Sequence, residues 1–382
     1  MPELPEHRWA RDAETLAELA TQMAAAEWIA LDSEANSMFV YRERVCLIQL
    51  NVGGALWLVD PLALTEGLPA ERRGEPLAAL AGPLADPRIR VWMHGGGNDV
   101  TGLERDFGLR MTNVFDTQQA ASFLGWARTG YAAVVEAVCE VRLAKDHTQY
   151  DWGQRPIDAG ALRYALDDVV HLPAIGVELE RQIAAADLVE ELDIANHALS
   201  QATANPAGFD PSRMWKLKGA TELRSDRLPV LAALYAWRDA KGEALDHPPG
   251  RLIANEPLVH LAAHAPRDAD ALRRSRIRGA FVRAHADELL EVIRRALAEP
   301  PPVPSRDDRR KRPPASVANR DKALRGWRRE EAERRGLPAH VVLPPRALDW
   351  LATHGRAGLA DCPELGRKRL ARYGDELERL LG

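Results

Sequence analysis

The chain has 382 residues, enough for two or three domains, and its apolar fraction of 46% supplies material for folded cores. Three cysteines, Cys46, Cys139 and Cys362, lack metal-ligand spacing and favour a reducing compartment over a disulfide scaffold. No uncharged apolar run approaches the roughly 18 residues that a membrane span needs, and the first residues lack the pattern of a signal peptide. We therefore expect a cytoplasmic protein that does not contact a membrane.

The formal net charge of −5 hides an asymmetry along the chain. Residues 301–382 contain 19 Lys and Arg against 12 Asp and Glu, so the rest of the chain is strongly acidic. An acidic body with a basic end is typical of nucleic-acid-binding proteins, although solvated helix faces also produce this pattern.

The first predicted elements are one helix and three strands. Apolar residues recur at helical spacing within residues 14–23, which predicts an amphipathic helix. Apolar runs then predict strands at residues 28–34, 45–50 and 55–59. The Asn-Val-Gly-Gly sequence at 51–54 is a hairpin signal, so the three strands should form a meander.

The next predicted elements alternate between helix and strand. They are a helix at 77–84, a strand at 90–94, a helix from about residue 98, a strand at 114–116, and mostly helix over 118–171. Strands followed by alternating strands and helices indicate an α/β domain with a mixed five-stranded sheet packed by helices.

Acidic side chains interrupt these elements at several places. Asp32 and Glu34 are two apart on a strand and project from one face, where like charges are costly to bury without a cation. A hard divalent metal bound through oxygen is the simplest compensation. Asp99 falls in the first turn of a helix, and Tyr164 and Asp168, four apart, share one helix face. Each of these three patterns, taken singly, is better explained by solvated acidic side chains. Only their combination along the chain indicates a functional site.

In this order along the chain, the five residues form the signature of the DEDDy 3′→5′ exonucleases, and the chain resembles the ribonuclease D family. The resemblance implies an RNase H-like (DEDD) exonuclease domain. Further matching stretches are Cys46–Leu50, Val59–Leu62, His94, Asp116–Gln118, Ala120, Ala121, Phe123, Lys145, Asp151–Trp152 and Arg155–Pro156. Ser33 stands where the family usually has Thr, and Gly95–Gly97 is richer in glycine than expected before the second-motif Asp.

The resemblance also implies a metal site. Two divalent ions, Mg²⁺ or Mn²⁺, would lie about 4 Å apart. Asp32 would bridge both ions, Glu34 and Asp168 would complete the metal on the nucleophile side, and Asp99 would help hold the other. No organic cofactor is expected.

By the same resemblance, Tyr164 would hydrogen-bond the attacking water. It need not be the base, because a phenol pKa near about 10 is too high unless the metals lower it. His94 and His171 are interpreted as structural, since carboxylate chemistry with hard metals does not require them.

After about residue 200 the sequence contains an internal repeat offset by 90 residues. The copies resemble two HRDC modules, helical domains that follow the nuclease in ribonuclease D and in some helicases. The repeat relates Leu234, Trp237, Arg238, Ile253, Leu258, Leu261 and Ala262 to Leu324, Trp327, Arg328, Leu343, Leu348, Leu351 and Ala352.

Four segments are therefore predicted: an exonuclease domain at 1–200, a first HRDC domain at 215–300, a Pro-rich basic linker at 301–315 and a second HRDC domain at 316–382. The tryptophans of the repeat are expected to fill helical cores. The linker and the Arg-Lys-Arg sequence at 367–369 are the expected phosphate contacts.

These observations predict a metal-dependent 3′→5′ exoribonuclease that trims the 3′ ends of structured RNA, such as tRNA precursors. It would hydrolyse phosphodiesters with two metal ions and release 5′-mononucleotides. The expected partner is RNA with a free 3′ end, and the expected state is a monomer. One alternative is a 3′→5′ DNA exonuclease, because the motifs do not read the sugar. Another is a nucleic-acid-binding scaffold with a degenerate nuclease site, to which the glycine run before Asp99 points.

Overall fold

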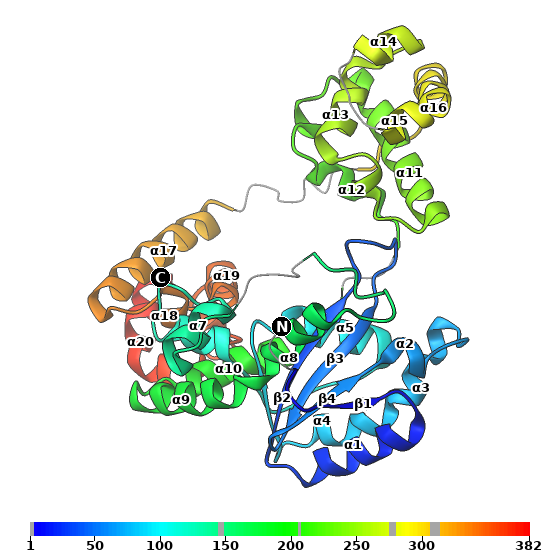
Figure 1. Ribbon diagram of the computed structural model, residues 1–382. Coiled ribbons are helices and arrows are strands. Elements are labelled where there is room, and N and C mark those ends of the chain that lie inside the picture. The colour runs from blue at the N-terminus through cyan, green and yellow to red at the C-terminus, as the bar shows by residue number, and fades with distance from the viewer. Residues whose placement is uncertain (1–3, 144–148, 205–207, 275–279, 306–313) are drawn as a thin grey trace. The chain divides into compact units, whose positions relative to one another are not determined.

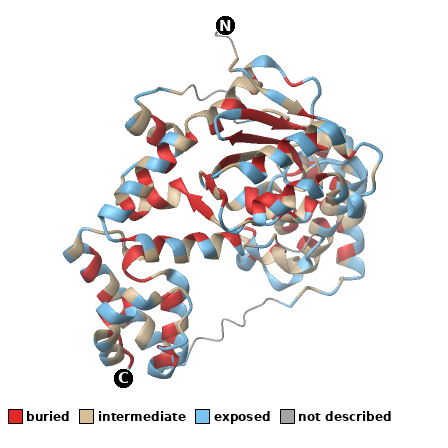
Figure 2. Cartoon of the chain, turned by 90° about the horizontal axis from the view of Figure 1, so that it is seen from below, coloured by how far each residue is buried: buried red, intermediate tan, exposed pale blue. Residues whose placement is uncertain are grey.

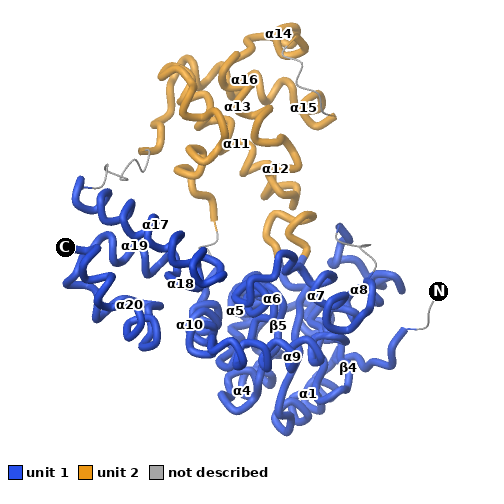
Figure 3. The backbone as a smooth tube through the Cα atoms, turned by 90° about the vertical axis from the view of Figure 1, so that its left-hand side faces the viewer, with its two compact units in different colours: residues 1–35, 44–204, 313–382 blue, residues 36–43, 205–312 orange. Residues whose placement is uncertain are grey.

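The computed structural model describes residues 4–143, 149–204, 208–274, 280–305 and 314–382. The chain forms two compact units, coloured separately in Figure 3. The first comprises residues 1–35, 44–204 and 313–382, and the second comprises residues 36–43 and 205–312. Lys145 and most of the basic part of the linker lie outside the described residues.

The first unit is built on one mixed sheet of six strands, in the spatial order β1-β4-β3-β2-β5-β6. Strands β2, β3 and β4 form an antiparallel meander, β5 and β6 run parallel to β2, and β1 runs parallel to β4. The strands are β1 (Arg8–Ala10), β2 (Trp28–Ala35), β3 (Val45–Val52), β4 (Ala55–Val59), β5 (Arg90–Met93) and β6 (Val114–Asp116). The sixth strand beyond the five predicted is β1, which at three residues is too short to show an alternating pattern.

Up to residue 204, the described part of this unit has ten α-helices, which together cover both faces of the sheet (Figure 1). They are α1 (Ala13–Ala25), α2 (Pro61–Leu64), α3 (Gly74–Leu77), α4 (Ala81–Ala85), α5 (Gly97–Phe107), α6 (Thr117–Phe123), α7 (Tyr131–Cys139), α8 (Ala159–Val170), α9 (Leu172–Ala185) and α10 (Val189–Ser200). The helix predicted at 77–84 is broken into α3, a 3₁₀ turn and α4, because Pro83 lacks an N–H and is tolerated only in a first helical turn.

The core lies on both sides of β3, all eight residues of which are buried (Figure 2). Leu16 and Leu19 of α1 pack with Ile48 and Leu50 on one face. Helix α8 packs with Leu47 and its neighbours on the other. A strand covered on both faces has a continuous apolar sequence, so β3 was predictable as a strand but its faces were not.

The second unit is helical, with α11 (Leu228–Leu245), α12 (Pro249–Leu252), α13 (Asn255–His264), α14 (Ala269–Arg274), α15 (Ala280–Ala284) and α16 (Ala286–Ala298). It also includes the loop that follows β2. The Tyr41 hydroxyl donates to Asp239 Oδ2 at 2.7 Å, and the Tyr41 N–H donates to Asp246 Oδ1 at 3.0 Å. Arg42 forms an ion pair with Glu243 at 2.7 Å. Side chains of α11 and the residue that caps it therefore hold this loop.

The second helical copy consists of α17 (Ala315–Arg335), α18 (Ala339–Val342), α19 (Pro345–His354) and α20 (Gly366–Leu381). The repeat has a structural counterpart. Arg238 Nη1 donates to the Ile253 carbonyl at 2.7 Å in the first copy, and Arg328 Nη1 donates to the Leu343 carbonyl at 3.2 Å in the second. Each arginine thus ties its first long helix to the backbone fifteen residues further along the chain.

The second copy packs on the sheet domain within the first unit. Glu190 of α10 accepts from the backbone N–H groups of Arg367, at 2.6 Å, and Lys368, at 3.1 Å, at the start of α20. The Lys368 ammonium forms an ion pair with Asp187 at 2.7 Å. Val341 of α18 is buried in the same apolar cluster as Phe123 of α6.

The prediction that Arg369 contacts phosphate is wrong, because its side chain is buried at 2% exposure. Its guanidinium donates instead to the carbonyls of Val341, at 2.9 Å, and Glu364, at 3.0 Å. Arg367 remains exposed. Within the described residues, no helix is both long and apolar enough to span a membrane.

Gly176 provides a test of how α9 packs on the sheet. A Cβ atom at this position would lie 2.6 Å from two carbons of the Trp92 ring, so α9 reaches the sheet only where a side chain is missing. We expect Gly176→Ala to destabilise the protein by about 1–3 kcal/mol through overpacking, seen as a lower melting temperature.

Gly326 of α17 is the matched control, since a Cβ there meets nothing within 4 Å. Gly326→Ala should raise the stability by about 0.5–1 kcal/mol, because glycine is unfavourable inside a helix. Equal melting temperatures for Gly176→Ala and the unchanged protein would contradict the close approach of α9 to Trp92.

Candidate active site

Asp32 and Glu34 lie where β2 extends beyond its neighbour β5. The parallel pairing of β2 with β5 ends at Ala30, whereas the pairing with β3 continues through Glu34. Both carboxylates therefore stand at the carboxyl end of the parallel strands, on the face that α8 covers. Ligands of α/β proteins commonly bind at this edge of the sheet.

Helix α8 brings Asp168 to the same place. Its first turn is capped by Asp158, whose carboxylate accepts from the N–H groups of Gly160 at 2.8 Å and Ala161 at 2.9 Å. The buried face of α8 fixes its rotation on the sheet. As a result, carboxylate oxygens of Asp32, Glu34 and Asp168 all lie within 4.8 Å of one another. We call these three residues the acidic cluster.

Asp99 reaches the acidic cluster through a turn that requires glycine. Gly95 has φ +67°, and a Cβ on Gly95 would lie 2.8 Å from the Gln118 side chain. The Asp116 carboxylate accepts from the N–H groups of Gly95 at 3.1 Å and Gly96 at 2.8 Å. The turn ends at α5, whose first turn holds the buried Asp99. Glycine at position 95 is thus a structural requirement of this turn.

Ser33 completes the placement of Asp99. Its hydroxyl donates to Asp99 Oδ1 at 2.6 Å. Ser33 lies between Asp32 and Glu34 on β2, so the strand that carries two carboxylates also orients a third. This hydrogen bond was not predictable from the sequence, because 66 residues separate its two partners.

Burial and the repulsion of nearby carboxylates raise the pKa values of all four carboxyl groups. Burial is the largest cause in each case. The pKa of Asp32 lies well above its usual range, with the charges of Asp99 and Asp168 next in importance. The pKa of Glu34 rises to about 8, that of Asp168 to about 7 and that of Asp99 to about 6. Such crowding of carboxylates is relieved by bound cations.

Tyr164 projects from α8 one turn before Asp168. Burial, and then the charges of Asp168 and Glu34, raise the pKa of its hydroxyl above the usual value. The hydroxyl therefore keeps its proton and is a hydrogen-bond donor. Its ring packs against Trp152, with 6.3 Å between the ring centroids.

His94 and His171 do not join the acidic cluster. His94 Nδ1 lies 2.8 Å from the Thr117 hydroxyl, and burial lowers its pKa. Burial also lowers the pKa of His171, which precedes α9. Tyr131 is a residue near the cluster that no sequence motif indicated. Its hydroxyl donates to the Asp167 carbonyl at 2.9 Å. Burial, and then the charges of Asp168 and Asp32, raise the pKa of this hydroxyl.

An ion pair between Arg155 and the buried Asp60 holds the segment that leads into α8. Arg155 donates from Nε and Nη2 to the two Asp60 carboxylate oxygens, both at 2.8 Å, and from Nη2 to the Cys46 carbonyl at 2.7 Å. Burial raises the pKa of Asp60, but the hydrogen bonds and charge of Arg155 outweigh it and the pKa is lowered. This pair anchors the chain before α8 to the ends of β3 and β4.

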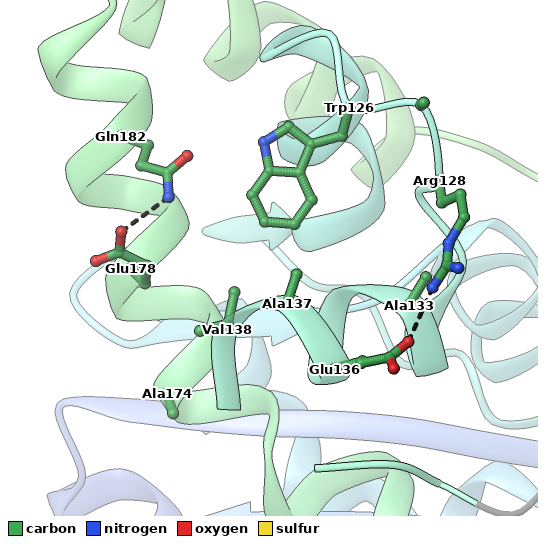
Figure 4. A pocket seen from close by; sticks show the side chains of 10 residues that line it. Trp126, Arg128, Ala133, Glu136, Ala137, Val138, Ala174, Glu178 and Gln182 are labelled. Atoms are coloured by element: carbon green, nitrogen blue, oxygen red, sulfur yellow. Dashed lines mark hydrogen bonds and ion pairs between the residues drawn. The ribbon is translucent and has the colours of Figure 1, made fainter. Parts of the chain in front are cut away.

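A separate pocket of about 860 Å³ lies between α7 and α9 and contains none of the five predicted site residues (Figure 4). Gln182 donates to Glu178 at 2.8 Å, and Arg128 pairs with Glu136 at 3.0 Å (Figure 4). The pocket is therefore not the site of the acidic cluster.

Comparison with known proteins places this site in a family. Residues 7–184 match a family model described as 3′-5′ exonuclease, and residues 227–293 and 318–381 match the HRDC domain. Ribonuclease D of Zymomonas mobilis is 31% identical over 314 residues, which cover 80% of this chain and 76% of that protein. The chain belongs to the ribonuclease D family.

Other members of the ribonuclease D family agree over nearly the whole chain. Ribonuclease D of Pseudomonas paraeruginosa is 29% identical over 357 residues, which cover 92% of this chain and 90% of that protein. The solved structure of Escherichia coli RNase D superimposes with a TM-score of 0.69 at 25% identity and covers 98% of each chain.

Membership of the ribonuclease D family makes the chain a 3′→5′ exoribonuclease with an RNase H-like nuclease domain and HRDC domains. The alternatives of a DNA exonuclease and of a degenerate scaffold are not favoured. The exonuclease family is metal-dependent, and this chain holds an acidic cluster of three carboxylates.

The raised carboxyl pKa values predict how the stability of the metal-free protein depends on pH. Their folded values exceed the unfolded value of about 4, so the folded chain binds more protons and loses stability as pH rises from about 4 to 8. Replacing one of these carboxyl groups by an amide should reduce this loss of stability. In EDTA we expect Asp168→Asn to raise the melting temperature at pH 8 and to raise it less at pH 5.

Asp86 is the control of opposite sign, because hydrogen bonds from Arg88 lower its pKa to about 2. Asp86→Asn should give no gain at pH 8. If Asp168→Asn lowered the melting temperature at both pH values, repulsion within the cluster would be refuted as a source of instability.

Proposed function

We propose that the enzyme trims the 3′ ends of structured RNA, such as tRNA precursors, and releases 5′-mononucleotides. The observation that carries this proposal is the convergence of carboxylates from β2, α5 and α8 at one edge of the sheet. The substrate class is supported by Escherichia coli RNase D, which is described as an exoribonuclease involved in structured RNA processing. The structures of this chain and of Escherichia coli RNase D superimpose over nearly the whole length of both chains.

We further propose that Asp32, Glu34, Asp99 and Asp168 hold two divalent ions, Mg²⁺ or Mn²⁺. The residues fit hard cations, because all four offer carboxylate oxygens. The charged groups that shift the pKa values of Asp32 and Glu34 are all carboxylates. No positive side chain among them offsets this negative charge, so the site attracts a cation. When bound, such ions activate water and stabilise the negative charge that develops on the phosphate and the leaving oxygen.

Tyr164 is proposed to orient the attacking water. Its hydroxyl keeps its proton, so it can donate a hydrogen bond but not accept the proton that the water loses. The ring packs on Trp152, which fixes its direction. A donor held this way restricts the approach of the water to the phosphate.

The direct test uses 5′-labelled RNA strands that end in a 3′-hydroxyl or in a blocking 3′-phosphate, each with Mg²⁺, with Mn²⁺ and with EDTA. Shortening by single nucleotides should require the free hydroxyl and a divalent ion. Asp32→Asn should abolish cleavage while RNA binding survives, because the variant loses a charged ligand but keeps its shape.

Asp86→Asn, a surface change beside Arg88, should cleave normally. A DNA strand of the same sequence in the same assay compares the two sugars. Cleavage by Asp32→Asn at the unchanged rate in EDTA would remove the metal-ion proposal.

Tyr164→Phe separates the chemical role from packing. The variant keeps the ring and the four carboxylates, so affinity for metal and RNA should change little. We expect the single-turnover rate to fall by about 10²–10⁴-fold, the range of orienting and acid–base contacts. Tyr150→Phe is the matched control, because its hydroxyl accepts from the Asp158 N–H at 3.2 Å rather than facing the cluster. A Tyr164→Phe variant with full rate and a lower melting temperature would show a packing role only.

A further inference from the structure

Gln49 occupies an unusual position for an amide. It lies in the middle of β3 with 0% of its surface exposed, and its register partner on β2 is Asp32. Residues directly opposite each other on antiparallel strands project from the same face, with Cβ atoms about 4.5–5.5 Å apart. Gln49 therefore projects from the face of the sheet that carries Asp32.

Asn51 identifies what covers this face. It is two residues from Gln49 and so projects from the same side of β3. Its Nδ2 donates to the Val169 carbonyl of α8 at 3.2 Å, and its Oδ1 accepts from the Gly54 N–H at 3.0 Å. Gln49 is thus enclosed between β3 and α8, the helix that carries Tyr164 and Asp168.

The two amides differ in one respect. Both polar groups of Asn51 are satisfied, whereas neither Oε1 nor Nε2 of Gln49 has a hydrogen-bond partner among the described residues. A buried amide without partners is costly, and Leu47 and Leu50 show that this part of β3 accommodates apolar side chains. Packing alone gives no reason for glutamine at this position.

Asp32, the register partner of Gln49, lacks a side-chain hydrogen-bond donor. Asp99 receives the Ser33 hydroxyl at 2.6 Å, but no described side chain donates to the Asp32 carboxylate, whose one favourable hydrogen bond comes from the Ser33 backbone. A carboxylate that lacks a side-chain donor and an amide that lacks an acceptor therefore face each other across two adjacent strands.

We propose that Gln49 is a positioning residue of the acidic cluster. Its Nε2–H donates to the Asp32 carboxylate through one buried water and holds that carboxylate in the orientation in which the cluster binds divalent cations. This inference rests on the proposed metal site and assigns to Gln49 the task for Asp32 that Ser33 performs for Asp99. Partners of this kind orient metal ligands in many sites.

The test measures Mn²⁺ binding to the full-length protein by calorimetry, without RNA. Gln49→Met keeps the length of the side chain and removes the amide. We expect the Mn²⁺ affinity to fall by about 10–100-fold, the usual effect of losing such a partner. The melting temperature in EDTA should stay the same or rise, because a buried unpaired amide is gone. With RNA, kcat should fall while KM stays unchanged.

Asn51→Leu is the matched control on the same face. It removes an amide that is bonded to α8, so the melting temperature should fall while the Mn²⁺ affinity is kept. Gln49→Leu provides a second variant of different shape, which should repeat the loss of affinity.

Two results would overturn the proposal. One is Mn²⁺ binding by Gln49→Met and Gln49→Leu as tight as that of the unchanged protein. The other is an equal loss of affinity in Asn51→Leu, which would attribute the effect to loosened packing. Failure of the proposed metal site itself is distinguishable, because the unchanged protein would then bind no Mn²⁺.

Discussion

The repulsion among carboxylates that the fold holds at one edge of the sheet is the constraint on which the rest of the structure depends. Asp32 and Glu34 share a strand face, and Asp168 comes within 4.8 Å of both. Without cations this arrangement opposes folding, since burial and like charge raise every pKa in the group. The remainder of the nuclease domain must therefore be stable enough to hold the site together. Metal ions bound at the proposed site would offset the repulsion and raise the stability of the folded state.

The supports of the site are polar contacts between segments far apart in the sequence. Asp116 ties down the glycine turn before α5, and the Asp60–Arg155 pair fixes the chain that enters α8. Each support lies in or beside a stretch that matched the ribonuclease D family, which explains why those stretches accompany the signature acids. They position the elements from which the acidic side chains project.

Most of the fold was predictable because its signals are local, whereas the five signature residues were predicted from their common order along the chain. Apolar runs marked the strands, and the spacing of Tyr164 and Asp168 placed both on one helix face. Three features were out of reach. The glycine turn depends on Asp116, twenty residues away, and the role of Gln49 depends on strand register. Arg369 looked like part of a basic surface because charge shows in a sequence, whereas the carbonyls that bind its guanidinium do not.

The division into units has a consequence for synthesis on the ribosome. Residues 313–382 complete the first unit, yet the 108 residues from 205 to 312 belong to the second and are translated before them. At roughly 5–20 residues per second, synthesis of the 137 residues from 205 to 341 takes about 7–27 s, and during this time Val341 cannot cover the apolar surface around Phe123. A nascent chain in this interval carries every carboxylate of the site and an uncovered apolar face. An abandoned translation product that stops there thus exposes hydrophobic surface, the feature that chaperones and proteases recognise.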